Sequence, residues 1–250
     1  MRMAIVVKSL DNSEKPDQGV RRGRGRPPHG WMALLCLPIL AQTPPPANDW
    51  KLVPGVRVGP ILAGTVRADL PRFFPKEAVE DDEIELDEGM LQAATLIYKG
   101  DPSQSLAISW DSKGPQAHPK QVFICHGLRR GGCRWQTSGG IQFGTHLSDL
   151  EAMNGGPFTV SGFGFNYGGN VLSWDGGKLA KLDCGGRVVL TLDGERSGAA
   201  RYRVPMTPDE VHAVRGDRPI SSSTPAMRKL NPAVVGILFQ FLRPDSKKCE

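Results

Sequence analysis

A short internal repeat constrains the fold of this chain more than any other feature of its sequence. Residues 59–70 (GPILAGTVRADL) align with residues 139–150 (GGIQFGTHLSDL), and six of the twelve positions are identical. Repetition of a short unit indicates related structural modules that pack against neighbours. The repeat is defined by a Gly-Thr pair and a later aspartate, at Gly64, Thr65 and Asp69 in the first copy and Gly144, Thr145 and Asp149 in the second.

The second copy of the repeat predicts a strand, a turn and a short helix. Ile141 and Phe143 alternate with polar or small residues, as they would in a strand. The Thr145 hydroxyl is suited to cap a helix, and Asn154-Gly155 is suited to end it. The first copy predicts the same elements, with a helix that Pro71 limits or kinks.

Beyond the repeat, the sequence is rich in strand and turn signals. It contains 30 glycines and 21 prolines, which favour turns and short strands over long helices. We therefore predict an α+β fold of two tandem modules, residues 52–134 and 135–200, each a short helix packed on a small antiparallel sheet, with a helix and strand extension over residues 201–250. A single mostly-β domain is the alternative. The predicted strands are 93–98, 105–110, 121–125, 158–167, 171–174, 179–182, 187–192 and 233–241.

Helix starts and one acidic segment complete the outline. The segment Thr207-Pro208-Asp209-Glu210 combines a cap, a proline suited to the first helical position and acids that the helix dipole favours. Ser223 or Thr224 before Pro225 predicts another helix, which Asn231-Pro232 would end. Residues 80–88 are interpreted as a solvated acidic insertion loop rather than a calcium site, because they lack the Asp-x-Asp-x-Asp-Gly spacing.

An aromatic segment in the second half offers a candidate binding surface. A Gly168-Gly169-Asn170 turn after the 158–167 strand predicts a hairpin with one aromatic face and one nearly bare face. The aromatic residues are interpreted as core rather than as a ligand platform; they are Trp110, Trp135, Trp174, Phe163, Phe165 and Tyr167. A glycan or another backbone would approach the bare face, and the candidate surface comprises Gly162, Gly164, Asn166 and Trp174.

The N-terminal residues predict export. Four arginines in residues 21–26 precede the apolar stretch 31–41, and a proline-rich linker over residues 42–51 follows, which is the order of a secretory signal. Eleven apolar residues are too few to span a bilayer, which needs about 20. We expect cleavage after Ala41 and, because residues 1–20 make the leader long, a natural start near Val20. A buried helix behind a basic arm, a twin-arginine signal and lipidation at Cys36 are weaker alternatives.

Four cysteines lie beyond this leader, an even number that favours disulfides in an oxidising compartment. Cys125 and Cys133 bracket a turn-like segment, and a bridge between them is predicted. A second bridge, Cys184 with Cys249, has less support. Zinc at Cys125-His126 and Cys133 is disfavoured, because there is no C-x-x-C and no second ligand pair.

The charge distribution and the histidines give no support to nucleic-acid binding or to catalysis. The net charge is +5, but residues 1–41 carry +4 of it, so the remainder is nearly neutral and has no electrostatic case for a polyanion. His118, His126, His146 and His212 are scattered, and neither a G-x-S-x-G nor an H-E-x-x-H motif is present. We expect no cofactor, and the Arg215-Gly-Asp217 tripeptide is too short to carry meaning.

Two resemblances bear on the fold. The pattern Gly144, Thr145, Asp149-Leu150 and Gly155-Gly156-Pro157 resembles the helix-then-sheet modules of the BamE (SmpA/OmlA) and β-lactamase-inhibitor-protein group. The chain is also similar to a set of exported bacterial proteins with no assigned activity. That similarity implies export and a shared fold, and it rests on Gly140-Ile141, Gly144-Thr145, Asn154–Phe158, Gly162–Phe165 and Ser173–Leu179.

These features favour a non-catalytic periplasmic or envelope binding protein, whose partner is an envelope protein or a wall glycan. The alternative is an inhibitor of a secreted hydrolase, which the modular resemblance implies. An enzyme is the third class, since the sequence shows no acid–base cluster.

Overall fold

The structure is a computed structural model and describes residues 48–86, 89–128, 132–183, 186–196, 199–202 and 204–241. Residues Pro44–Glu250 form one compact unit, and the fold below is the fold of that unit. The expected leader, Cys184 and Cys249 lie outside the described residues, so these expectations stay predictions.

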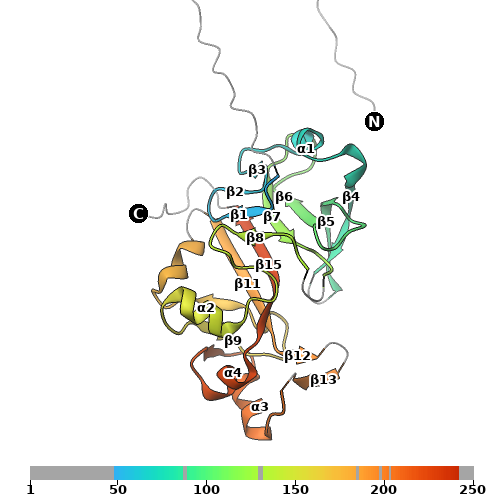
Figure 1. Cartoon of the computed structure of the whole chain (residues 1–250). Helices are drawn as coiled ribbons and strands as arrows, with labels where there is room; N and C mark the ends of the chain where they lie inside the picture. The colour runs from blue at the N-terminus through green and yellow to red at the C-terminus, as the bar shows by residue number, and fades with distance from the viewer. Residues whose placement is uncertain are drawn as a thin grey trace, which may run out of the picture. The chain divides into compact units, whose positions relative to one another are not determined.

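The main element is a six-stranded antiparallel sheet with the order β11-β15-β7-β6-β5-β4 (Figure 1). The long apolar strand β15 pairs with β11 on one side and with β7 on the other. The strands are β4 Val79–Glu85, β5 Leu91–Ile97, β6 Leu106–Trp110, β7 Pro119–Ile124, β11 Gly186–Asp193 and β15 Ala233–Phe241.

This sheet changes the predicted domain organisation. Mixed α and β content is confirmed, but the sheet joins strands from residues 52–134, 135–200 and 201–250. The expectation that each module has a sheet of its own therefore does not hold for the main sheet. The physical reason lies in β15, whose backbone forms hydrogen bonds along both of its edges. It pairs with β7 of the first predicted module and with β11 of the second, and so joins them in one sheet.

Smaller elements surround the sheet. One four-stranded sheet has the order β3-β2-β1-β8, a three-stranded sheet has the order β10-β9-β14, and β12 pairs with β13. Their strands are β1 Lys51–Val53, β2 Arg57–Val58, β3 Ile61–Leu62, β8 Gln136–Thr137, β9 Thr159–Ser161, β10 Val171–Ser173, β12 Glu195–Arg196, β13 Ala199–Tyr202 and β14 Pro219–Ser221. The helices are α1 Leu70–Phe73, α2 Leu147–Asn154, α3 Pro208–Val214 and α4 Pro225–Leu230, with 3-10 turns η1 Arg67–Asp69, η2 Lys76–Ala78 and η4 Lys178–Asp183.

The two copies of the repeat make the same local hydrogen bonds. The hydroxyl of Thr65 accepts from the Leu62 N–H at 2.9 Å, and that of Thr145 accepts from the Gln142 N–H at 3.0 Å. The residues after the threonines, Val66 and His146, donate their backbone N–H groups to Asp69 and Asp149, each at 3.3 Å. The two carboxylates thereby cap the helix that follows. Thr145 is thus a turn residue, and the helix cap falls on the next residue, because the hydroxyl already serves the turn.

In the described part of the chain, the larger of two hydrophobic clusters lies on one face of the main sheet, and a smaller cluster of Ile84, Ala94, Leu96 and Ala107 packs against Phe123. Trp135, Phe158 and Phe239 are fully buried in the larger cluster, and α2, α4, η4 and the two smaller sheets contribute to it. Trp174 and Phe163 are also buried, which confirms the core interpretation for these aromatic residues. Phe165 and Tyr167 differ, since each is 58% exposed.

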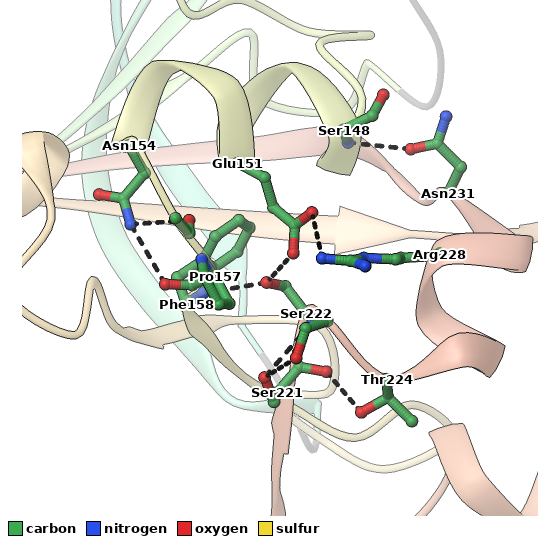
Figure 2. A network of polar contacts seen from close by, with 12 residues as sticks. Ser148, Glu151, Asn154, Pro157, Phe158, Ser221, Ser222, Thr224, Arg228 and Asn231 are labelled. Atoms are coloured by element: carbon green, nitrogen blue, oxygen red, sulfur yellow. Dashed lines mark hydrogen bonds and ion pairs between the residues drawn. The ribbon is translucent and has the colours of Figure 1, made fainter.

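A partly buried polar network fixes α2 to the segment that begins at β14 (Figure 2). Glu151 in α2 accepts a hydrogen bond from the Ser222 hydroxyl at 2.5 Å and lies 3.5 Å from the Arg228 guanidinium. The Ser222 hydroxyl in turn accepts from the Phe158 N–H at 2.9 Å. Ser222 is fully buried with both hydrogen-bonding roles satisfied, so its position is explained by packing rather than by nucleophilic chemistry.

Three predicted elements are corrected. The acidic run is not a loop: Val79–Glu85 forms β4, an edge strand, where Lys99 forms ion pairs with Glu80 and Asp82 at 2.9 and 2.8 Å. Residues 179–182 lie in η4 rather than in a strand. The 158–167 strand ends at Ser161, because the chain then turns toward α3.

Several predicted helix boundaries, the last strand and the disulfide agree with the structure. Thr207 caps α3, Pro225 starts α4, which Asn231 ends in a left-handed conformation, and β15 covers residues 233–241. The Cys125–Cys133 disulfide is present. The predicted linker over residues 42–51 is corrected at its end, because Lys51 already pairs in β1.

Candidate functional site

The face of the main sheet opposite the core forms an open groove of about 720 Å³. Strands β7, β15 and β11 make its floor, because their residues alternate between the core and the groove. The volume lies within the range of about 300–1,000 Å³ typical of small-ligand sites. This groove is the candidate functional site.

Strand register divides the floor into rows. Phe123, Leu238 and Val189 are cross-strand neighbours and form a half-buried apolar row. Next to it, Gln121, Gln240 and Arg187 are neighbours in the same way and form a polar row.

On the other side of the apolar row, Gly236 lies opposite Thr191. The Thr191 hydroxyl donates to Asn170 Oδ1 at 2.6 Å, which extends this second polar row beyond the sheet. An apolar stripe therefore runs between two polar stripes, and all three are open to a ligand in the groove.

Residues 162–170 carry one wall of the groove, which residues 165–168 and 170 line, and they present its exposed aromatic rings. We call this segment the aromatic loop. Phe165 and Tyr167, each 58% exposed, and Leu172 just beyond the loop, 44% exposed, line the groove. Large exposed apolar side chains that gather at one place are typical of a binding site.

Backbone hydrogen bonds hold the aromatic loop on both sides. The Phe163 N–H donates to the Val214 carbonyl at 2.8 Å, and the Gly162 N–H donates to the Arg218 carbonyl at 3.0 Å. On the other side, the Leu192 N–H of β11 donates to the Gly169 carbonyl at 2.8 Å. The exposed rings therefore lie on a segment whose backbone is fixed, which lowers the entropy that a ligand must overcome on binding.

Two glycines make these close approaches feasible. Gly169 has a φ of +78°, and a Cβ there would collide with the Leu192 carbonyl oxygen. A Cβ at Gly162 would collide with the Gly216 carbonyl oxygen. The glycines of the aromatic loop thus serve backbone packing, not a bare ligand-binding face.

The groove carries few charges. Of the described residues that line it, none is Asp, Glu or Lys, and the ionisable side chains besides Tyr167 are Arg187 and His126. Arg187 lies 3.8 Å from Asp183. Burial lowers the pKa of His126, whose ring also packs edge-on against Phe123 with centroids 6.1 Å apart. At neutral pH this histidine is uncharged, so the groove presents mainly neutral polar groups.

The Cys125–Cys133 disulfide lies at the end of β7 next to the groove. Its sulfurs close a loop with a sequence separation of 8, and Cys125, His126 and Leu128 line the site. Cys125 adopts a φ of +49°, an unusual conformation for a residue with a side chain. The bridge therefore holds the rim of the groove in place.

The structure brings together only part of the predicted binding surface. Asn166 lines the groove, and Gly164 is exposed but packs beside the Arg215 guanidinium. Gly162 and Trp174 are buried, with Trp174 only 3% exposed, so neither belongs to a surface. The six residues that define the repeat lie in turns and helix caps at Gly64, Thr65, Asp69, Gly144, Thr145 and Asp149, and none of them lines the groove.

The sheet floor of the groove was not predicted from the sequence. Gln121, Phe123, Val189, Leu238 and Gln240 belong to strands that were predicted, but their common face depends on the register between distant strands. The available signal was the pattern of residue types in these strands, because one face of each strand is neither fully apolar nor fully charged.

The four histidines do not form a common site. His118 Nδ1 lies 3.3 Å from the Thr65 carbonyl, His146 Nδ1 lies 3.0 Å from the Asn231 carbonyl, and His212 is on α3. Within the described residues, no three His, Cys, Asp or Glu side chains are grouped as metal ligands. In the same part of the chain, no helix is both long and apolar enough to cross a membrane.

Comparison with known proteins adds no relative. No protein-family model, curated protein or solved structure matches the chain. The groove itself is therefore the basis for a proposed function.

Proposed function

We propose that this chain is a non-catalytic binding protein of the periplasm or envelope and that it holds its ligand in the groove. The observation that carries the proposal is the pair of exposed rings, Phe165 and Tyr167, fixed beside a half-buried apolar row of the sheet. Exposing such rings to water is unfavourable, and a ligand that covers them gains apolar contact area. A fixed wall beside a formed floor is also the geometry of a site that exists before its ligand arrives.

Export is the second part of this proposal. The Cys125–Cys133 disulfide supports an oxidising compartment, because disulfides persist outside the reducing cytoplasm. The leader predicted over residues 1–41 also supports export from the cytoplasm.

The experiment that tests ligand binding uses the immobilised purified protein and an envelope extract. We expect the wild-type protein to retain a component that Phe165→Ala and Tyr167→Ala fail to retain. Val56→Ala is the matched control, since Val56 is 52% exposed and is not among the residues that line the groove. Retention that is unaffected by the two aromatic substitutions, or is lost equally with Val56→Ala, would contradict the proposal.

An inhibitor of a secreted hydrolase is the second candidate, and one observation favours it. The Cys125–Cys133 bridge closes the loop between these residues, and covalent closure is a common way to keep an inserting loop in its bound conformation. An inhibitor would lose activity on substitution within residues 126–128 while Phe165→Ala leaves it unchanged. For the binding protein proposed first, Phe165→Ala instead abolishes retention of the envelope component.

A further inference from the structure

We propose that the ligand of the groove is an uncharged oligosaccharide. This inference rests on the proposed binding function and specifies the ligand class of the same site. A pyranose ring presents C–H groups on its two faces and hydroxyl groups around its edge. A protein surface complementary to it has an apolar stripe or an aromatic ring that contacts the face of the sugar. Neutral hydrogen-bonding groups on either side of that stripe bind the hydroxyl groups at the edge of the sugar.

The floor of the groove has this division. The apolar row of Phe123, Leu238 and Val189 lies between the Gln121–Gln240–Arg187 row and the row that contains Thr191. Alternate residues of a strand are about 7 Å apart, so each polar row lies about that distance from the apolar row. A sugar ring stacked over Leu238 therefore places its edge hydroxyls over amide and hydroxyl groups on both sides.

The aromatic loop supplies a second apolar surface at the wall. Phe165 and Tyr167 expose more than half of their surface toward solvent beside the floor. Every unit of a sugar chain has its own C–H faces, so one unit on the floor and the next against these rings would use both surfaces.

The polar groups of the groove select a neutral ligand. The Gln240 side-chain amide forms no hydrogen bond within the described part of the chain, and it lies in β15, the middle strand of the floor, with both donor and acceptor available. No described lining residue is a carboxylate or a lysine, and Arg187 has Asp183 beside it. A charged ligand would lose its hydration here with little counter-charge in return.

The same geometry disfavours the other ligand classes. An extended peptide gains affinity by adding a strand to a free sheet edge. In the floor, β15 is paired on both sides, and the edge strand β11 already pairs with the aromatic loop through Thr191 and Leu192. A lipid acyl chain would cover the Gln121–Gln240 and Thr191–Asn170 groups without providing hydrogen-bond partners.

The test is a calorimetric titration of the purified protein with three neutral hexasaccharides: the N-acetylglucosamine hexamer of chitin, cellohexaose and maltohexaose. Hexameric glucosamine and hexagalacturonate are the cationic and anionic counterparts. We expect saturable binding of at least one neutral hexamer, and binding at least about tenfold weaker for both charged hexamers. Phe165→Ala and Gln240→Met each weaken the neutral hexamer about tenfold, whereas Val56→Ala leaves its affinity unchanged. Gln240→Met keeps the length of the side chain and removes only its hydrogen-bonding groups.

Two outcomes would overturn the inference, and the envelope retention assay tells them apart. If no neutral hexamer binds while Phe165→Ala still abolishes retention of an envelope component, the groove is a binding site for another ligand class. If no hexamer binds and retention is also independent of Phe165, both the proposed binding function and the oligosaccharide ligand are wrong. Neutral-hexamer binding that Gln240→Met does not weaken would overturn the role of the polar rows.

Discussion

Thr191 in β11 donates a hydrogen bond to Asn170 Oδ1 at 2.6 Å, and this bond joins the floor of the groove to its aromatic wall. The Asn170 N–H is itself held by the Ser161 hydroxyl at 3.0 Å. The position of Phe165 and Tyr167 over the sheet thus depends on contacts of the loop backbone and of one side chain from β11.

Replacing Thr191 with valine keeps the shape of the side chain and removes its hydroxyl. Asn170 loses its donor, so we expect the free energy of unfolding to fall by about 1 kcal/mol. Ligand retention should weaken as well, because the loop loses a contact that holds the rings. Thr191→Ser, which restores the hydroxyl, is the control. Chemical denaturation and the retention assay measure both effects; a valine variant as stable and as active as the serine variant would contradict the role of this bond.

Two glycines with nearly equal φ angles allow the cost of backbone strain to be measured apart from the cost of a steric collision. Gly169 and Gly176 have φ values of +78° and +77°. A Cβ at Gly169 meets the Leu192 carbonyl, whereas nothing lies within 4 Å of a Cβ at Gly176. Gly176→Ala should cost about 1 kcal/mol from the backbone conformation alone. Gly169→Ala should cost distinctly more and should disturb the aromatic loop.

Thermal unfolding of the two alanine variants compares these costs directly, and retention by the groove gives a second measurement. Equal stability of the two variants would mean that the Leu192 carbonyl moves away without cost. In that case the contact between the loop and β11 would not determine where the aromatic rings lie.

Local chemistry made part of the fold predictable. Thr207 accepts from the Glu210 N–H at 3.3 Å and Glu210 accepts from the Thr207 N–H at 2.8 Å, a cap that depends on four consecutive residues. The buried alternation of β11 and the disulfide across a short loop were likewise local patterns. Such features follow from sequence because all the residues involved are close along the chain.

The parts that were not predicted depend on distant contacts. The acidic strand β4 is stable at the sheet edge because Lys99 pairs with two of its carboxylates and Asp81 pairs with Arg67. Charged residues are common on edge strands, but the same composition also fits a loop. The groove was missed for a similar reason, since Phe123, Leu238 and Val189 become neighbours only through the register of three strands.

The Cys125–Cys133 disulfide should stabilise the protein by restricting the unfolded chain. For a loop with a sequence separation of 8, the chain-entropy relation gives about 2–3 kcal/mol. The paired variant Cys125→Ser with Cys133→Ser should therefore unfold at lower denaturant concentration than the wild type. Denaturation in the presence of a reductant provides the control, because it should bring the wild type to the stability of the variant. A wild-type protein that is equally stable with and without reductant would show that the bridge contributes nothing.

His126 should make stability fall in mildly acidic solution. Burial lowers its pKa below the ordinary value of 6.5, so the unfolded chain binds the proton more readily than the folded protein. Stability from this group is therefore complete above pH 6.5 and decreases as the pH falls through that value toward the lower pKa of the folded state. His126→Gln removes this contribution and keeps a polar side chain at the rim. Denaturation of both proteins from about pH 8 to about pH 4.5 should show the wild type losing stability relative to the variant below pH 6.5, while carboxylate titrations affect both alike. Parallel curves over that range would mean that the His126 ring is protonated as easily in the groove as in water.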